Sequence, residues 1–131
     1  MVFVCLLGGF VLFPGDVEQA AERVLAQEVS HVAWIKSPHH GSRTSSSLDL
    51  LRALSPRGVV VSCGPENRFG HPAPEVLRRY RGLSVHRTDS GSIQLWSNGR
   101  KERIRRWMPS GRWSPWSDAT GTHSSRSSSG R

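Results

Sequence analysis

The sequence predicts an α/β fold in which successive strands are joined through helices. Short apolar runs rich in Val, Ile and Leu alternate with segments whose apolar residues recur at helical spacing. Turn-forming Gly, Pro, Asp and Ser residues separate these segments. The length of 131 residues suits one small domain with a modest core. The expected element order is β-β-α-β-α-β-α-β-β, which is typical of layered α/β domains.

Six apolar runs are expected to form strands: residues 2–7, 10–13, 31–36, 59–63, 83–88 and 92–96. The first two flank Gly8-Gly9, which fits a two-residue hairpin turn. The fourth run, VVVSC (59–63), is apolar and rich in β-branched residues, which is typical of a central strand. The last two flank Asp89-Ser90-Gly91, which predicts a second hairpin.

Three helices are expected between the strands. Asp16 can cap a helix over 17–27. Its apolar residues share one face at helical spacing: Val17, Ala20, Ala21, Val24 and Leu25. Ser46 and Asp49 are spaced like a capping box and open the helix LDLLRAL. Pro74 suits the first turn of a third helix, PEVLRRYR.

The net charge of +8 is concentrated at the end of the chain. Residues 1–97 hold ten basic and eight acidic residues, whereas residues 98–131 hold eight basic and two acidic ones. We expect 1–97 to be the folded domain and 98–131 to be a basic Ser/Arg/Trp-rich tail, disordered from 108 onward, with 100–107 suited to a short basic helix. Basic residues with Trp between them can contact phosphates and stack on bases, so a small non-enzymatic nucleic-acid-binding protein is one alternative.

The two cysteines do not indicate whether the protein resides in an oxidising or a reducing cellular compartment. Two are too few for a disulfide framework, and both Cys5 and Cys63 lie in apolar runs. The apolar start lacks a basic region and a small-residue cleavage site, and it is too short to span a bilayer as a helix. We therefore expect a soluble chain without a signal peptide or transmembrane helix. A buried hairpin at the very start also predicts a piece of a longer protein.

Polar loops follow three of the expected strands. Their candidate site residues are Asp16, then His39 and His40, then Asn67, Arg68 and His71. If these strands are parallel, the loops meet at the carboxyl edge of the sheet, where open α/β folds bind ligands. Imidazole together with carboxylate suits zinc, manganese or iron better than calcium or magnesium. The alternatives are that Asp16 only caps a helix, that His71 braces its loop, and that Arg68 faces water.

The turn SPHHGSRTSSS adds an anion site to these candidates. Gly41 permits a tight backbone path beside an ion. The Ser/Thr run that begins at Ser42 supplies donors at a helix N-terminus, and Arg68 can clamp a phosphate. A metal beside an anion pocket is what phosphoester hydrolysis requires; the alternative is a polar loop with a helix cap.

Four stretches resemble the C-terminal hydrolase-like domain of the ComEC family, the competence channel proteins of bacterial DNA uptake: FPGDVEQAAERVL, IKSPHHGSRTSSS, NRFGHPAPEVLRRYR and HRTDSGSI. That domain belongs to the metallo-β-lactamase superfamily, and the resemblance covers about residues 2–96. It implies the C-terminal half of an αββα sandwich that hydrolyses DNA with zinc or manganese, up to two ions in the intact domain. It also implies a full-length protein that is a channel in the bacterial inner membrane.

The resemblance implies that Asp16 and one histidine of the His-His-Gly-Ser turn are metal ligands, with His39 favoured and His40 as its rival. The candidates for catalysis are His71, His40 and Asn67, and those for substrate binding are Ser42 and Arg68.

The first metal motif of the superfamily, H-x-[HD]-x-D-H, is absent from the sequence, and so is the next histidine motif. A catalytic zinc normally has three protein ligands, and two ions need more. We therefore expect the chain alone to be weakly active or inactive, with the missing N-terminal half of the domain as its partner. A lactonase or thioesterase of the same superfamily is a further alternative.

Overall fold

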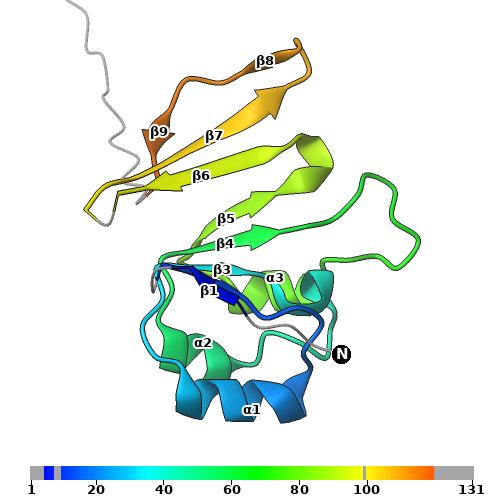
Figure 1. Cartoon of the computed structure of the whole chain (residues 1–131). Helices are drawn as coiled ribbons and strands as arrows, with labels where there is room; N and C mark the ends of the chain where they lie inside the picture. Colours follow the sequence, from blue (N-terminus) through cyan, green and yellow to red (C-terminus); the bar gives the residue numbers. More distant parts are fainter. Residues whose placement is uncertain (1–4, 8–9, 99, 120–131) are drawn as a thin grey trace, which may run out of the picture.

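The computed structural model describes residues 5–7, 10–98 and 100–119 of the chain. They form three layers: helices, a first sheet and a second, antiparallel sheet (Figure 1). The fold is therefore mixed α/β, as the sequence predicts.

The first sheet has five strands in chain order. They are β1 (Cys5–Leu7), β2 (Val11–Phe13), β3 (Trp34–Lys36), β4 (Gly58–Val61) and β5 (Ser84–Arg87). β1 and β2 are antiparallel, whereas β2, β3, β4 and β5 pair in parallel. Because parallel strands end on the same side, the loops after β2, β3 and β4 leave from one edge of the sheet, which we call the carboxyl edge (right-hand side of Figure 1).

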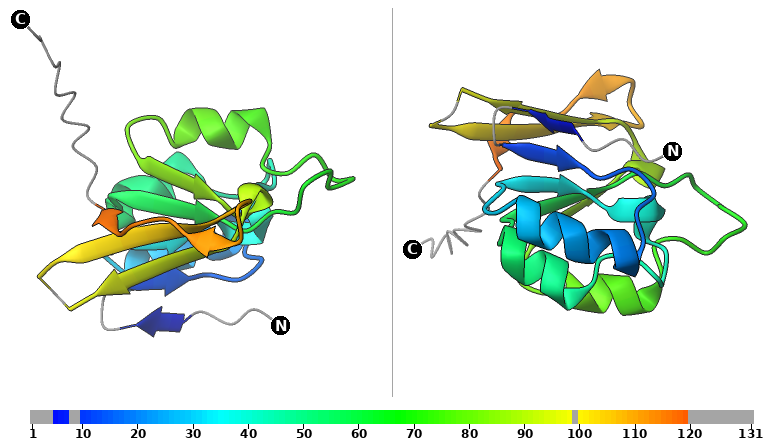
Figure 2. Two further views of the ribbon diagram at one scale, coloured as in Figure 1. Left: turned by 90° about the horizontal axis from the view of Figure 1, so that it is seen from above. Right: turned by 60° about the horizontal axis from the view of Figure 1, so that its bottom comes forward.

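Three helices cover one face of this sheet (Figures 1 and 2). They are α1 (Gln19–Glu28), α2 (Leu48–Leu54) and α3 (Pro74–Arg79). The main core lies between these helices and the sheet and includes Leu12, Ile35, Leu50, Leu54, Val59, Val61 and Val76. Burial of these side chains, at roughly 1.5–3 kcal/mol each, holds the sheet and its carboxyl edge in place.

The second sheet packs on the other face of the first (Figures 1 and 2). Its strands are β6 (Ile93–Ser97), β7 (Glu102–Met108), β8 (Arg112–Trp113) and β9 (Ser117–Asp118). A smaller core of Trp34, Ile104 and Ala119 lies between the sheets. Trp34 Nε1 donates a hydrogen bond of 3.0 Å to Glu102 Oε2, which ties the two sheets together.

The predicted element order is confirmed through residue 97, but the second hairpin is wrong. β5 pairs with β4 and β6 pairs with β7, while residues 88–90 form a short 3-10 turn. This turn carries the chain from one sheet to the other. The Gly8-Gly9 turn lies outside the described residues, although β1 and β2 pair antiparallel as predicted.

The segment after residue 97 also differs from its expectation. Residues 102–108 form β7 instead of a helix, and β8 and β9 lie in the part expected to be disordered. The reason is a period of two: Glu102 and Ile104 face the first sheet, while Arg103 and Arg105 alternate with them. Residues 120–131 lie outside the described part of the chain.

The structure also corrects the predicted N-caps of two helices and the predicted apolar face of α1. Asp16 does not cap α1, whose N-cap is Glu18 without a side-chain bond. The predicted apolar face of α1 is correct only in part: Val17 is buried and Leu25 packs against the core, whereas Val24 is 58% exposed and the buried residue of the helix is Glu22. Ser47, not Ser46, caps α2, accepting a bond of 3.3 Å from Leu50 N.

Within the described ranges, no helix is both long enough and apolar enough to cross a bilayer. Cys63 is a half-buried free thiol, and the side chain of Cys5 lies outside the described part.

Candidate functional site

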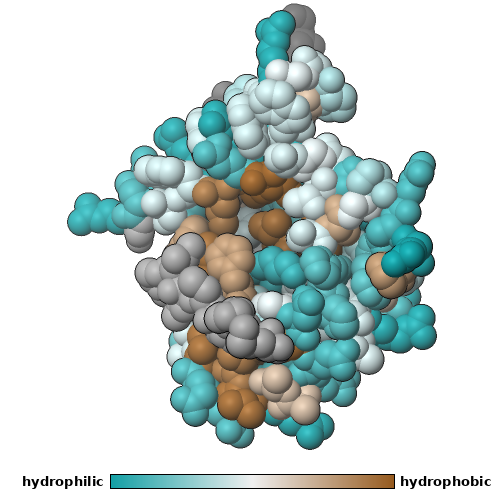
Figure 3. Space-filling view, turned by 45° about the vertical axis from the view of Figure 1, so that its right-hand side comes forward, coloured by the Kyte–Doolittle hydropathy of each residue, from teal (hydrophilic) through white to brown (hydrophobic). Residues whose placement is uncertain are grey.

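The three polar loops converge at the carboxyl edge. Asp16 lies after β2, His39 and His40 after β3, and His71 in the loop between β4 and α3. His40 Nε2 is 3.7 Å from Asp16 Oδ1, and the ring centroids of His39 and His71 are 6.2 Å apart. In Figure 3, where this side of the molecule comes forward, hydrophilic side chains cover much of the surface beside a smaller apolar area.

The ring of His40 is fixed by the backbone of the neighbouring loop. Its Nδ1 lies 2.8 Å from the carbonyl oxygen of Ser62, so this nitrogen carries the hydrogen and donates it. In the neutral ring, Nε2 then has a free lone pair on the side of Asp16. Imidazoles that bind metals usually have this arrangement, with the other ring nitrogen donating to a carbonyl or carboxylate.

His39 faces a different carboxylate. Its Nδ1 is 3.2 Å from Glu18 Oε1, but this nitrogen is buried and has no hydrogen-bond partner among the described residues. The carboxylate of Glu18 also accepts a bond of 3.0 Å from Thr44 Oγ1. The two adjacent histidines therefore point to two different acids.

His71 lines a cavity of about 230 Å³ at the same edge, together with His40, Cys63, Asn67 and Phe69. Burial lowers the pKa of His71, and the nearby His39 and His40 lower it further. The neutral imidazole is thus favoured at this position.

Asn67 braces the backbone of His71. Its Oδ1 accepts from the His71 backbone N–H at 2.8 Å, and its Nδ2 donates to the His71 carbonyl oxygen at 2.7 Å. Both functional atoms of this side chain are therefore used to hold the loop.

The two remaining candidates lie at the rim. Ser42 is buried within the turn, with its backbone N–H bonded to His39 O at 2.9 Å and its Oγ 3.2 Å from Thr44 Oγ1. Arg68 is exposed, and its guanidinium lies 5.1 Å from the centre of the Phe69 ring. Arg68 is thus free to reach a ligand from the loop, whereas Ser42 mainly shapes the turn.

The His-His turn has an unusual backbone. His39 (φ 42°, ψ 44°) and His40 (φ 55°, ψ 18°) both adopt the left-handed conformation, which costs each non-glycine residue about 1–3 kcal/mol. Gly41 continues with φ 83° and lies against Pro72, where an added Cβ would come within 2.6 Å of the proline Cβ. Such strain is typical of binding and catalytic loops that their surroundings hold in place.

A buried polar cluster beneath this turn was not predicted from the sequence. The hydroxyl of Tyr80 is 2.7 Å from Ser37 Oγ and 2.5 Å from Ser46 Oγ. The buried carboxylate of Glu22 accepts from the backbone N–H groups of Ser46 and Ser47. Nothing in the local pattern distinguishes Glu22 from Glu28, the exposed acid of the same helix.

The donor set fits part of a metal site. Asp16 and His40 approach each other with a free imidazole lone pair, but the part of the chain that the structure describes contains no group of three or more His, Cys, Asp or Glu side chains that could hold an ion. The charge of Asp16 also acts on Lys36, the last residue of β3. Burial lowers the pKa of the Lys36 ammonium group, and the negative charge of Asp16 opposes part of that shift.

Comparison with known proteins gives a consistent set of relatives. No family model matches the chain. It is 37% identical over 94 residues to Competence protein ComA from Neisseria gonorrhoeae, covering 67% of this chain and 14% of that protein. It is 29% identical over 109 residues to Recombination protein 2 from Haemophilus influenzae, covering 81% of this chain and 14% of that protein.

A third relative is ComE operon protein 3 from Bacillus subtilis, which is 31% identical over 88 residues, covering 63% of this chain and 11% of that protein. The chain thus matches between 11% and 14% of the length of these three relatives.

Proposed function

We propose that the chain is part of a metal-dependent hydrolase of the ComEC family, a nuclease-like domain that cleaves DNA phosphodiesters during uptake in competence. The observation that carries this proposal is the 3.7 Å approach of His40 Nε2 to Asp16 Oδ1, with Nδ1 of the same ring anchored on the Ser62 carbonyl. Similarity to a protein named as a competence protein supports the setting of DNA uptake.

The fold that we propose is the C-terminal half of a metallo-β-lactamase-type αββα sandwich. The helix layer and two facing sheets supply three of its four layers. Among the described strands, β6 pairs only with β7. Further strands of the sandwich would then extend the second sheet beyond β6, and their helices would cover those added strands.

Asp16 and His40 are the metal ligands of this chain in our proposal, and His39 is not. A bound zinc or manganese ion would polarise a phosphoryl oxygen and provide a water of lowered pKa. The Ser62 carbonyl holds the His40 ring in the tautomer that leaves Nε2 free. The neutral His71 imidazole in the neighbouring cavity is suited to accept a proton, and Arg68 to contact a phosphate.

The chain by itself is expected to be weakly active or inactive. Two donors are fewer than the three that a catalytic zinc site normally takes from protein. We propose that the remaining ligands come from the N-terminal half of the same hydrolase domain.

The test is a nuclease assay on fluorescent DNA with manganese or zinc. The chain is assayed alone and after addition of the N-terminal half of the domain as a separate polypeptide, and only the mixture is expected to cleave. His40→Asn and Asp16→Asn should abolish cleavage, because each removes one ligand. His31→Asn is the matched control, since His31 has the same left-handed backbone (φ 52°) and precedes β3 at the opposite edge.

Strong cleavage by the isolated chain would show that the expectation of inactivity is wrong. Cleavage by the mixture that survives both ligand variants would contradict the proposed site.

A further inference from the structure

Four of the five tryptophans lie on the outer face of the second sheet. Residues opposite each other in antiparallel strands point to the same side. The pairs on this side are Trp96 with Arg103, Gln94 with Arg105, Trp107 with Trp113, and Arg103 with Asp118 of β9. Ile104 and Glu102 alternate with them and face the first sheet. We call the outer set the Trp–Arg face: Trp96, Arg103, Arg105, Trp107, Trp113 and Trp116.

The arginine at the centre of this face is held in place by aromatic rings. The Arg105 guanidinium lies 4.8 Å from the ring centre of Trp113 and 4.4 Å from that of Trp116. Its Nε donates to Gln94 Oε1 at 2.7 Å. Trp107 packs edge-on against Trp113, with ring centres 5.4 Å apart. Held in this way, the cation loses little conformational entropy when a ligand binds.

Two large aromatic rings on the face remain open to solvent. Trp96 is 45% exposed and Trp107 is 41% exposed. Isolated exposed aromatic residues are ordinary, but here they flank an ordered cation on a sheet. Sheets that carry exposed aromatic and basic side chains are a recurring platform for unpaired bases.

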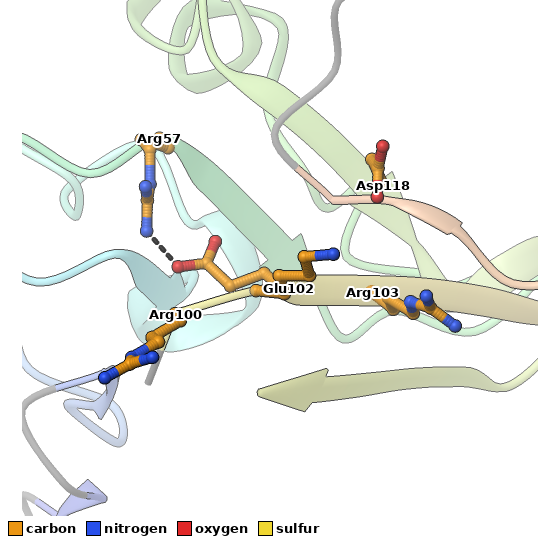
Figure 4. Close-up of a pocket in the computed structure, with 6 residues that line it drawn as sticks. Arg57, Arg100, Glu102, Arg103 and Asp118 are labelled. Carbon is orange, nitrogen blue, oxygen red and sulfur yellow. Dashed lines mark hydrogen bonds and ion pairs between the residues drawn. The ribbon is translucent and has the colours of Figure 1, made fainter. Parts of the chain in front are cut away.

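A basic cavity of about 390 Å³ continues the face at one end (Figure 4). Its lining residues are Arg57, Arg100, Lys101, Glu102, Arg103 and Asp118. Arg57 reaches the carboxylate of Glu102, whereas the side chains of Arg100 and Arg103 point away from that carboxylate. With Glu102 paired to Arg57, the lining has an excess of positive charge that suits a phosphate.

The cavity and the candidate metal site lie at opposite edges of the first sheet. Arg57 directly precedes β4, while His39 and His40 lie in the turn that follows β3, which runs parallel to β4. Arg103 belongs to both the cavity and the Trp–Arg face, so these two form one continuous surface.

We propose that this surface binds single-stranded nucleic acid, with bases stacked on Trp96 and Trp107 and phosphates at Arg100, Lys101 and Arg103. Asp118 lies opposite Arg103 and offsets part of its charge. Arg105 contacts only Gln94 and tryptophan rings in the described contacts, so a helical layer over this face would bury its guanidinium group without a matching negative charge, which is costly. A polyanion supplies that charge, and every base has a ring face for stacking. The proposal needs no metal and goes beyond the proposed hydrolase.

The first experiment uses the unmodified chain with a chelator, so that the outcome does not depend on the hydrolase proposal. An oligothymidylate of about 15 nucleotides is the probe, since it spans one typical site. We expect it to quench tryptophan fluorescence and to bind less tightly as sodium chloride rises from about 50 to about 200 mM. Absence of quenching, or equally tight binding of a duplex of the same length, would overturn the proposal.

The second experiment compares variants by fluorescence anisotropy. Trp96→Ala should weaken binding about tenfold, within the range measured for stacking on one aromatic side chain, and Trp96→Phe should retain most of it. Arg103→Gln should weaken binding and reduce the salt dependence by about one phosphate contact.

The matched controls are Leu48→Ala and Arg52→Gln on α2, which remove an exposed apolar side chain and an exposed charge from the opposite side of the molecule. Their affinities should equal that of the unmodified chain. Losses as large as those of the Trp96 and Arg103 variants, or no loss in Trp96→Ala, would show that the Trp–Arg face is not the binding surface. Binding of an added N-terminal half that protects Trp96 and Trp107 from a soluble quencher would instead assign the face to that partner.

Discussion

Oε2 of the buried Glu22 lies 2.8 Å from the backbone nitrogen of Ser47, and the same carboxylate accepts the N–H of Ser46. Ser47 is the N-cap of α2, where a helix has N–H donors without intrahelical partners, and Ser46 directly precedes it. A negative charge is also favourable at a helix N-terminus. One side chain of α1 therefore fixes the start of α2, which follows the His-His turn.

Glu22→Gln should lower the free energy of unfolding by about 1–3 kcal/mol, because the amide offers one oxygen acceptor where two N–H groups are buried. Urea unfolding followed by circular dichroism measures this loss. Glu28→Gln is the matched control, since it removes the same charge from an exposed position at the end of α1. Equal stability of the two variants would contradict the assigned role of Glu22.

Gly41→Ala should destabilise the protein by more than about 1 kcal/mol, because the backbone there is left-handed. The added methyl group would also meet Pro72 at 2.6 Å, in the loop that carries His71. Thermal unfolding is the measurement. Gly64→Ala is the control, because an added Cβ at Gly64 meets nothing within 4 Å. A normal melting temperature for Gly41→Ala would show that the turn is not constrained by Pro72.

The first sheet and its edge were predictable because their signals are local. β3 and β4 are short apolar runs between turn residues, and each is followed by polar residues. That pattern places Asp16, His40 and His71 after successive parallel strands, and the 3.7 Å approach of His40 to Asp16 agrees with this placement. The roles of these residues stay predictions.

The second sheet was not predictable in the same way because its pairing is non-local. β6 follows β5 after a turn that also fits a hairpin, yet its partner is β7. In β7 the period of two is hard to recognise, because both faces carry arginine: Arg106 donates to Ser90 Oγ at 2.9 Å, while Arg105 stacks on tryptophan. The composition of residues 100–107 therefore indicated a short basic helix, with disorder from 108 onward, although pairing with β6 makes β7 a strand.

The buried acid of α1 and the choice between the two histidines were also beyond sequence reasoning. The partners of Glu22 lie 24 and 25 residues away. His39 and His40 are neighbours whose ring directions depend on Glu18 and Ser62. Neither relationship leaves a sign in local spacing.

Tyr80 is the single tyrosine of the chain, so its ionisation can be followed directly by tyrosinate absorbance. Burial raises the pKa of Tyr80, and the negative charge of Glu22 adds to this, against the hydrogen bonds from Ser37 and Ser46. Since the folded pKa exceeds the unfolded value of about 10, the folded state binds the proton more tightly. Its stabilising effect is complete below that unfolded pKa and is lost as the pH rises through the folded pKa.

We therefore expect tyrosinate absorbance to appear only above the ordinary range and together with unfolding. Tyr80→Phe should be less stable near neutral pH, because Ser37 and Ser46 lose their partner. Above pH of about 10 it should lose less stability than the unmodified chain. Tyrosinate that forms in the ordinary range while the fold persists would contradict the burial of the phenol.

The ring directions of the two adjacent histidines predict which one binds metal. His40→Asn should weaken zinc or manganese binding by at least about tenfold, because it removes the lone pair beside Asp16, whereas His39→Asn should leave it nearly unchanged. Asparagine is chosen because it tolerates the left-handed backbone of both positions. Calorimetric titration of the metal into each variant is the measurement, with unfolding curves to confirm equal stability. The reverse order of affinities would transfer the ligand role to His39 and require its ring to turn from Glu18 toward Asp16.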